Sequence, residues 1–160
     1  VGEICTRSES RYDGYYKDEV LTAETRRGDY LTVGDLGRID AEGLLWFTGR
    51  KRDIIKSGGI NVYAPEIEEA LASHPAIAEA HCIGLPDPRW TEAICAVVVP
   101  APGAQLTKAE VIEHAATRLD RYKRPRRVVF MAAVPRNLTG RVLKTELKEA
   151  VLTLPEEKNQ

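Results

Sequence analysis

The order of apolar and polar residues predicts short strands and amphipathic helices along the whole chain. The run from Val1 to Arg7 predicts a short strand. The segment KDEVLTAETRR is rich in helix formers and places Val20, Leu21 and Ala23 on one side of a helix. The chain is therefore expected to begin with a strand, followed by one helix.

A hairpin is predicted next, in YLTVGDLGRIDAEGLLWFTGR. Leu36 to Ile39 would form one strand and Leu44 to Phe47 the other, with the turn DAEG between them. Gly43 of this turn is able to adopt the positive φ that many hairpin turns require. The first 48 residues are thus expected to be rich in strands and turns.

The pattern changes after Gly49, where a helix with a clear apolar stripe is predicted. Pro65 is placed in the first helical turn, where proline is tolerated, and Ile67 with Leu71 form the buried side. Glutamates in the first turn suit the positive end of the helix dipole. The dipeptide His74-Pro75 would end this helix.

Two strands bounded by proline follow this helix. They are predicted at Ala78 to Leu85 and at Ile94 to Pro100, joined by a turn at LPDP. A third strand is predicted in VVFMAAVP, after the basic loop RYKRPRR.

Two further helices complete the predicted fold. Thr107 and Glu110 form a capping box at the start of one of them, and the other spans about Lys144 to Leu154. Their buried positions are expected at Val111, Ala115 and Leu119 in the first and at Leu147, Val151 and Leu154 in the second. PEEKNQ at the end is expected to fray. The order helix, strand, strand, helix, strand, helix describes an α+β domain with helices packed on a short sheet.

Composition and charge exclude several classes of protein. Lys and Arg number 23 against 24 Asp and Glu, so no general attraction to nucleic acid or to an anionic membrane is expected. No apolar run approaches the roughly 20 residues of a membrane helix, and no charged-then-apolar leader opens the chain. The chain begins without an initiator Met, which suggests a piece of something longer. We expect a soluble, cytoplasmic protein.

The motifs of self-contained hydrolases and metalloenzymes are missing. The sequence has no GxSxG, HExxH, CxxC or GxxxxGK[ST]. Its three histidines and three cysteines show no metal-ligand or disulfide spacing, which fits structural roles in a reducing compartment. They are His74, His81, His114, Cys5, Cys82 and Cys95. No metal site is expected from these residues.

Four features are candidates for binding chemistry, each with a simpler reading. Lys56 with SGG would let an anionic ligand approach the backbone, or would be an ordinary turn. Asp35, at a predicted turn between strands, would hold a diol such as ribose, or would cap the turn. Trp90 would stack on a base or close a sheet edge. Arg141, on a glycine-bearing loop before the last helix, would bind phosphate or be solvated.

Five ordered segments together resemble the closing third of the adenylate-forming acyl-CoA synthetases, a family that includes luciferases and the adenylation domains of peptide synthetases. These segments are GYYKDE, YLTVGDLGRID, TGRKRDIIKSGGINVYAPEIE, YKRP and PRNLTGRVLK. The resemblance implies a two-step reaction. A carboxylate attacks ATP to give acyl-adenylate and pyrophosphate, and then a thiol, usually that of coenzyme A, displaces AMP.

The same resemblance implies a domain organisation. Residues 1–48 would be the end of the large N-terminal domain and residues 49–160 the mobile C-terminal domain, which rotates between the two steps. The phosphate loop, the acyl pocket and the site for Mg²⁺ would belong to the missing part of the large domain. The 160 residues alone are therefore expected to be inactive.

Site residues follow from the resemblance by position. For ATP or AMP it implies that Asp35 holds the ribose hydroxyls and that Arg50 lies near the same ribose, and it places Arg52 at the hinge. For thioester formation it implies a loop of Lys56, Ser57, Gly58 and Gly59 that lines the tunnel for the pantetheine arm. Trp90, Tyr122 and Arg124 match positions that contact the nucleotide end of coenzyme A in some relatives.

The sequence departs from the family pattern at three places. Val33 replaces a common Thr, and Ala64-Pro65 shifts the usual proline by one residue. Arg141 occupies the position of the lysine that bridges the carboxylate and the α-phosphate during adenylation. Because a guanidinium is larger than an ammonium and planar, we expect weakened adenylation in the parent protein, with thioester formation spared.

Two other functions stay open. The chain would belong to an adenylation domain that loads a carrier protein, although no GxDS-like phosphopantetheine site follows the last helix. Alternatively, it would be a non-catalytic binding module with the same fold, which Arg141 favours and the intact Asp35, Arg50 and SGG loop disfavour.

Overall fold

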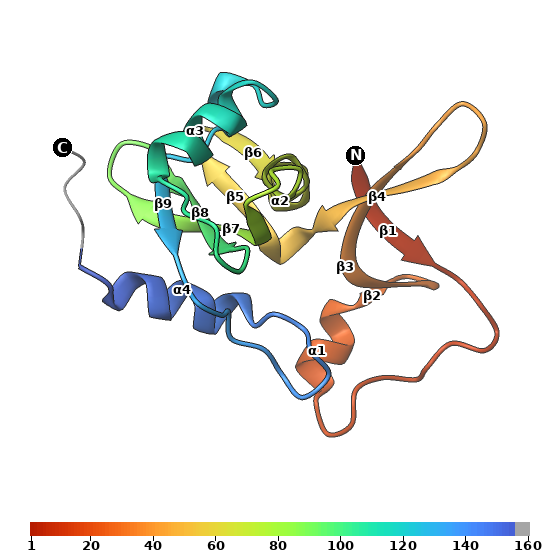
Figure 1. Ribbon diagram of the computed structural model, residues 1–160. Coiled ribbons are helices and arrows are strands. Elements are labelled where there is room, and N and C mark those ends of the chain that lie inside the picture. The colour runs from red at the N-terminus through yellow and green to blue at the C-terminus, as the bar shows by residue number, and fades with distance from the viewer. Residues whose placement is uncertain (156–160) are drawn as a thin grey trace. The chain divides into compact units, whose positions relative to one another are not determined.

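The computed structural model describes residues 1–155 and separates the chain into two compact units, Val1–Asp53 and Ile54–Gln160 (Figure 1). Of the end that was expected to fray, residues 156–160 lie outside the described residues. No helix in the described part is long and apolar enough to cross a membrane.

The first unit is a small antiparallel sheet with one short helix. Its elements are β1 (Gly2–Thr6), α1 (Glu19–Glu24), β2 (Arg26–Arg27), β3 (Tyr30–Ile39), β4 (Leu45–Arg50) and the 3-10 helix η1 (Lys51–Asp53). Strand β3 pairs with β1, β2 and β4. The predicted first strand, helix and hairpin are all confirmed.

The hairpin turn between β3 and β4 forms for the expected reason. Gly43 adopts φ +83°. The side chain of Asp40 closes the turn by accepting the backbone N–H groups of Glu42 at 3.1 Å and Leu44 at 2.8 Å. Local sequence therefore determines this turn.

The first unit buries little apolar surface. Leu31 and Leu36 are its buried apolar residues, and helix α1 has no buried residue. The apolar side of α1 and most of the hairpin strand β4 are exposed, including Val20, Trp46 and Phe47. A sheet of this size needs a buried apolar face for independent stability, so the unit by itself is poorly stabilised.

The second unit is larger and contains a five-stranded sheet. Its elements are β5 (Ile54–Ser57), β6 (Ile60–Tyr63), α2 (Ala64–Ala72), β7 (Ile77–Asp87), β8 (Thr91–Pro100), α3 (Lys108–Ala116), the 3-10 helix η2 (Arg121–Lys123), β9 (Arg127–Phe130) and α4 (Lys144–Thr153). The sheet order is β6-β5-β8-β7, and β9 pairs in parallel with β8.

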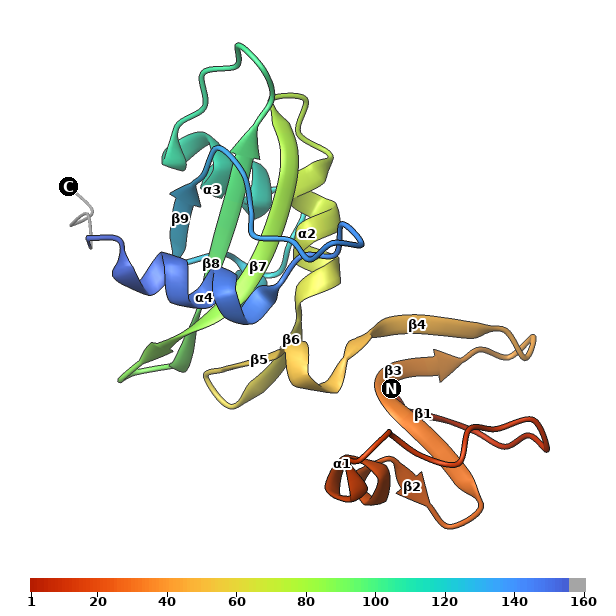
Figure 2. The ribbon, with the colours of Figure 1, turned by 90° about the horizontal axis from the view of Figure 1, so that it is seen from below.

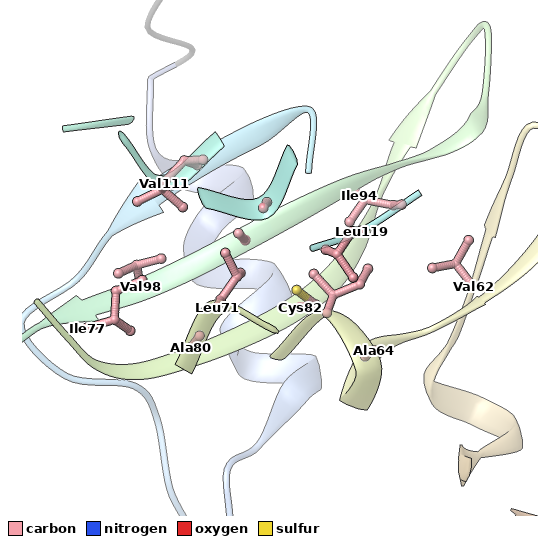
Figure 3. Close-up of a cluster of buried hydrophobic side chains, with 14 of the residues drawn as sticks. Val62, Ala64, Leu71, Ile77, Ala80, Cys82, Ile94, Val98, Val111 and Leu119 are labelled. Atoms are coloured by element: carbon pink, nitrogen blue, oxygen red, sulfur yellow. The ribbon is translucent and has the colours of Figure 1, made fainter. Parts of the chain in front are cut away.

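Helices cover both faces of this sheet. Helices α2 and α3 pack on one face and α4 crosses the other (Figure 2). The first face is closed by a cluster that includes Leu71, Cys82, Ile94, Val98 and Val111 (Figure 3). On the second face, Leu147 and Val151 of α4 pack against side chains of β7, β8 and β9.

The local signals for helices α2 and α3 are confirmed. Pro65 lies in the first turn of α2, where Ile67 and Leu71 are buried. Thr107 caps α3, and the reciprocal bonds of the capping box with Glu110 are both present. These signals depend on near neighbours in sequence, which is why they are readable before the fold is known.

Several details of the second unit differ from the expectation. The third strand, predicted in VVFMAAVP, is confirmed only in part, because β9 ends at Phe130. The short β5–β6 hairpin was missed, because each strand has only four residues and joins the sheet through distant partners. Strand β7 continues through Pro86 to Asp87 instead of turning at Leu85, since β7 lies at a sheet edge and an edge strand tolerates proline. Leu154 is 40% exposed rather than buried, because α4 ends at Thr153.

The three cysteines are free thiols in different surroundings. Cys5 is exposed, whereas Cys82 and Cys95 are buried on opposite faces of the second sheet. Burial raises the pKa of Cys95 to about 12 and raises that of Cys82 well above its ordinary value. Both buried thiols are therefore protonated and unreactive at neutral pH.

In the folded chain we expect iodoacetamide to alkylate Cys5 alone. Cys82 and Cys95 should react only after denaturation, because the thiolate is the nucleophile and neither buried thiol ionises. Mass spectrometry of peptides after timed labelling, with and without guanidinium chloride, measures this. Alkylation of either buried cysteine at a rate close to that of Cys5 under native conditions would contradict the described core.

Candidate functional site

Asp35 and Arg50 face each other in the first unit. They are directly paired residues of β3 and β4, and Arg50 Nε lies 3.2 Å from Asp35 Oδ1. Asp35 does not lie at a turn between two strands, as the sequence suggested. It lies within β3, at a bulge that also contains Gly34 at φ +78°. The bulge adds residues to β3 opposite β1 and so redirects the side chains there.

One oxygen of the Asp35 carboxylate has capacity to accept a hydrogen bond. Its Oδ1 is buried and has no hydrogen-bond partner within residues 1–155, because the approach of Arg50 lacks hydrogen-bond geometry. The positive charge of Arg50, 3.2 Å away, compensates this oxygen, but no donor is aligned with it. A hydroxyl group from a ligand would supply such a donor.

Arg52 lies at the end of the first unit. It is the middle residue of η1, its side chain is exposed, and its Nε lies 3.9 Å from Asp53 Oδ1. Asp53 is the last residue of this unit. This long pair with an exposed arginine restrains the backbone little, which is compatible with a hinge, although that role stays a prediction.

The SGG segment forms the turn of the β5–β6 hairpin. Ser57 pairs with Ile60, and Gly58 and Gly59 between them have φ +60° and +78°. Two successive positive φ values define the type I′ turn, which glycines adopt without strain. The hydroxyl of Ser57 is buried, so a ligand at this turn would meet the glycine backbone instead.

Gly58 is also required by its neighbour. Its N–H donates to the carbonyl of Trp90 at 2.8 Å, and a Cβ at Gly58 would lie 2.8 Å from Cε3 of the Trp90 ring. No larger residue fits without moving the indole. The turn and Trp90 therefore form one surface, although they are 32 residues apart in the sequence.

Trp90 carries a cation that the sequence analysis did not single out. The guanidinium of Arg126 lies 3.7 Å from the centroid of the Trp90 ring, and that of Arg89 lies 5.0 Å away. Asp87 fixes the segment by accepting the backbone N–H groups of Arg89 and Trp90. Arg126 belongs to the same basic loop as Arg124, so its composition gave a signal, but the pairing with Trp90 depends on the fold.

Within residues 1–155, Tyr122 and Arg124 make no hydrogen bond, ion pair or ring contact with this surface. Tyr122 is exposed in η2. Arg124 is partly buried and donates to the carbonyls of Leu119 at 3.1 Å and Ala116 at 3.0 Å. Its guanidinium thus caps the end of α3, and its contact with a nucleotide stays a prediction.

Thr91 has a strained backbone beside this surface. It pairs with Ser57 and has φ +68°, a value that a β-branched residue adopts only at a cost of about 1–2 kcal/mol. The contact of the β5–β6 hairpin with the start of β8 holds Thr91 in this conformation. The strain identifies a position where glycine would be favoured.

Thr91→Gly is expected to raise the free energy of unfolding of the second unit by about 1 kcal/mol. Strain relief of about 1–2 kcal/mol is offset by about 0.5–1 kcal/mol of backbone entropy. Thr145→Gly, at an exposed helical position of α4, is the matched control and should lower stability. Urea unfolding of both variants measures the difference, and equal destabilisation by the two would contradict the strain.

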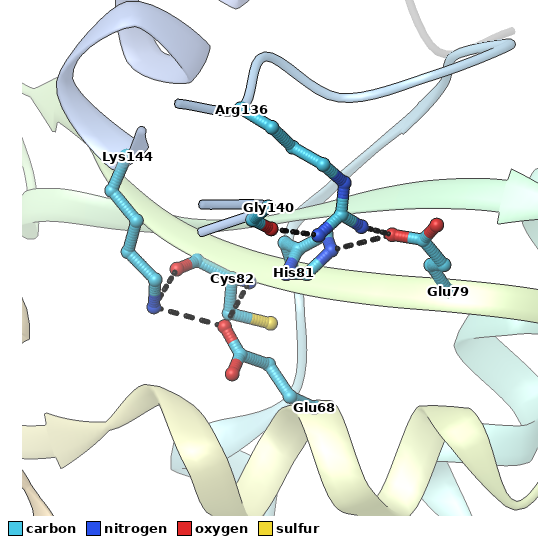
Figure 4. A network of polar contacts seen from close by, with 7 residues as sticks. All are labelled: Glu68, Glu79, His81, Cys82, Arg136, Gly140 and Lys144. Atoms are coloured by element: carbon cyan, nitrogen blue, oxygen red, sulfur yellow. Dashed lines mark hydrogen bonds and ion pairs between the residues drawn. The ribbon is translucent and has the colours of Figure 1, made fainter. Parts of the chain in front are cut away.

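Arg141 is exposed, on a loop between Arg136 and Lys144. The contacts of these two residues fix the loop at both ends (Figure 4). At one end Arg136 forms an ion pair with Glu79 and donates to the carbonyl of Gly140 at 2.8 Å. The backbone N–H of Arg141 donates to Asn137 Oδ1 at 2.8 Å. The loop backbone is ordered, while the Arg141 guanidinium makes no hydrogen bond or ion pair within the described part of the chain.

Lys144 fixes the other end of the loop. Its Nζ lies 2.9 Å from Glu68 Oε1 of α2 and 3.3 Å from the carbonyl of Cys82 in β7 (Figure 4). The same Glu68 oxygen accepts the N–H of Cys82 at 2.8 Å. The start of α4 is thereby attached to the edge of the sheet three residues after Arg141.

Glu79 stays ionised in this network. A hydrogen bond with His81, together with the charge of Arg136, lowers the pKa of Glu79 from its ordinary value. The ion pair with Arg136 is therefore fully formed at neutral pH. Residues 1–155 contain no group of three or more His, Cys, Asp or Glu side chains that could hold a metal ion.

Comparison with known proteins identifies the family. Residues 66–141 match the model of the AMP-binding enzyme C-terminal domain. The long-chain-fatty-acid–CoA ligase FadD13 of Mycobacterium tuberculosis is 40% identical over 148 residues, which are 92% of this chain and 29% of that protein. The indoleacetate–CoA ligase of Aromatoleum aromaticum is 39% identical over 151 residues, 94% of this chain and 30% of that protein.

Solved structures agree with this result. The o-succinylbenzoate CoA synthetase of Bacillus subtilis, in complex with its acyl-adenylate intermediate, has a TM-score of 0.86 at 33% identity, over 92% of this chain and 30% of that one. The amide bond synthetase McbA of Marinactinospora thermotolerans has a TM-score of 0.84 at 35% identity, over 93% of this chain and 31% of that one. The predicted fold class is confirmed.

The fold and the matched segment define the small C-terminal domain of adenylate-forming enzymes. The chain belongs to this family, and the curated relatives that it matches include CoA ligases. It spans 29–31% of the length of these relatives.

Proposed function

We propose that the chain is the C-terminal part of an AMP-forming acid–thiol ligase that converts a carboxylic acid, ATP and coenzyme A into acyl-CoA, AMP and pyrophosphate. The observation that carries this proposal is the exposed Gly58–Gly59 backbone beside the Trp90–Arg126 pair. On this surface, glycine backbone without side chains lies next to an aromatic ring and a guanidinium. A pantetheine arm ending in a nucleotide has the matching chemistry.

In the second step, the thiol attacks the acyl carbonyl and AMP leaves with the bonding electron pair. The Gly58–Gly59 turn would guide the pantetheine arm, because it presents backbone without side chains. Trp90 and Arg126 would hold the adenine and phosphate end, with Tyr122 and Arg124 as further contacts. Lys56, whose side chain is exposed beside the turn, would supply positive charge.

In the first step, a carboxylate oxygen attacks the α-phosphorus of ATP and pyrophosphate leaves. Asp35 Oδ1 would accept a ribose hydroxyl, which supplies the donor that this buried oxygen lacks. Arg50 would hold the Asp35 carboxylate in place from the neighbouring strand. Arg141 would approach the α-phosphate from its anchored loop, and Mg²⁺ would be held by the large domain.

The two steps would use different faces of the C-terminal domain. Residues 1–48 would end the large domain, residues 49–160 would form the mobile domain, and Arg52 would be the pivot. The contact surface of the mobile domain would change between the steps. A cytoplasmic location belongs to the same proposal, because ATP and coenzyme A are supplied there and the three thiols are free.

The proposal predicts a difference between the 160 residues and the full-length protein. The full-length protein should release AMP from ATP, coenzyme A and at least one acid in a panel of fatty and aromatic acids. The 160 residues alone should release none, because the phosphate loop and acyl pocket would be absent. AMP release by the short chain, or none by the full-length protein with any acid, would overturn the proposal.

A different acceptor is the second candidate, because an amide bond synthetase is among the similar structures. Separate assays of the full-length protein with coenzyme A, with a phosphopantetheinylated carrier protein and with an amine distinguish these acceptors. Product formed with the carrier protein or the amine alone would replace coenzyme A in the proposal. A non-catalytic module would bind coenzyme A in calorimetry without releasing AMP.

A further inference from the structure

Glu92, the second residue of β8, contacts both the turn at Gly58 and Gly59 and helix α4. Its Oε2 accepts the backbone N–H of Lys56 at 2.8 Å. Lys56 lies at the base of the turn formed by Gly58 and Gly59, the glycine turn. Oε1 of Glu92 lies 3.4 Å from Nζ of Lys148, one turn into α4 from Lys144. The Glu92 side chain is 24% exposed, so its hydrogen bond with the Lys56 N–H is partly shielded from solvent.

A glycine in the neighbouring strand makes room for this carboxylate. Gly84 of β7 lies diagonally across from Glu92, next to the directly opposite pair Pro86 and Glu92. A Cβ at Gly84 would lie 2.7 Å from the carboxyl carbon of Glu92 and 2.8 Å from both oxygens. Glycine weakens a strand interior, so its presence here indicates that another group must approach closely.

The glycine turn is attached to the start of β8 by three consecutive contacts. They are Gly58 N–H to the Trp90 carbonyl, the strand pair Ser57 with Thr91, and Lys56 N–H to the Glu92 carboxylate. Only the last of these uses a side chain of β8. It is therefore the one that a substitution can remove while the other two remain.

We propose that Glu92 is a positioning residue for thioester formation, which holds the Lys56 end of the glycine turn at the distance that the pantetheine arm requires. This inference rests on the proposed function, because the turn is the structure assigned to the second step. Glu92 touches neither substrate in this assignment. It acts through the backbone of Lys56. The absence of a side chain at Gly84 leaves the room that the Glu92 carboxylate occupies.

The test separates the two half-reactions in the full-length protein. Thioester formation from preformed acyl-adenylate and coenzyme A reports the second step, and ATP–pyrophosphate exchange reports the first. Glu92→Ala should lower the thioester rate by on the order of tenfold to a hundredfold, as small displacements of positioned groups do. Pyrophosphate exchange should stay within about twofold, because the turn belongs to the other step.

Three further variants define the cause. Glu92→Gln keeps an oxygen that accepts the Lys56 N–H, so it should retain the thioester rate within about threefold. Gly84→Ala should resemble Glu92→Ala, because the added methyl group displaces the carboxylate without removing it. Lys148→Met is the matched control and should change the rate by less than about threefold, since the pair is long and partly exposed.

Each outcome decides between the possibilities. A selective loss of the second step in Glu92→Ala and Gly84→Ala, with rescue in Glu92→Gln, supports the positioning role. The positioning role is overturned if both half-reactions lose the same factor. It is also overturned if Gly84→Ala keeps both the wild-type thioester rate and the wild-type melting temperature. A wild-type protein without either half-reaction overturns the proposed function, and the positioning role fails with it.

Discussion

Replacing Arg141 with lysine in the full-length protein is expected to raise the rate of ATP–pyrophosphate exchange by a factor on the order of 10²–10³. The anchored loop already presents residue 141 in an ordered backbone, so the variant changes the charged group and little else. An ammonium is compact and can contact two oxygens at one point, whereas the planar guanidinium must lie further back.

The same variant should leave the thioester step unchanged, because the glycine turn is a separate surface. Arg121→Lys, an identical exchange at an exposed position of η2, is the matched control and should leave both rates within about twofold. Pyrophosphate exchange that does not respond to Arg141→Lys would show that the guanidinium is as effective as the ammonium.

Replacing Leu147 with alanine is expected to lower the free energy of unfolding of the second unit by about 2–5 kcal/mol. Leu147 is 0% exposed and fixes α4 to the second face of the sheet, together with Val151. Truncation removes apolar contact and leaves a cavity that a sheet and a helix cannot close. Urea unfolding of the 160 residues, followed by far-ultraviolet circular dichroism, measures the change.

Leu152→Ala in the same helix is the control for this measurement. Its side chain is 51% exposed, so the expected change is within about 0.5 kcal/mol. Equal effects of the two substitutions would mean that α4 is not docked through Leu147. If Leu147→Ala unfolded α4 at lower urea concentration and left the unfolding of the sheet unchanged, the second unit would not unfold cooperatively.

The fold of the second unit was predictable where its signals are local. The capping box at Thr107, the proline at the start of α2 and the apolar stripe of Ile67 and Leu71 need only near neighbours. The β5–β6 hairpin was missed because its strands are too short for a periodic pattern. Pro86 misled the prediction, because a sequence does not show which strand lies at a sheet edge.

The candidate site was predictable only in its parts. Motif resemblance pointed to Asp35, Arg50 and the glycine turn, whose binding roles stay predictions. The bulge that contains Asp35 was not foreseen, because it depends on the register with β1. The stacking of Arg126 on Trp90 and the support of Lys56 by Glu92 join residues 36 positions apart. Such pairs are created by strand pairing, and no local pattern encodes them.

The capping of α3 by Arg124 changes how mutagenesis of the basic loop should be interpreted. An alanine at this position removes two donors from helix carbonyls as well as a positive charge, so a weaker affinity for the acceptor would combine two causes. Arg126 separates them, because its guanidinium lies over Trp90 and not on the helix. A scan that compares these two arginines distinguishes ligand recognition from helix order.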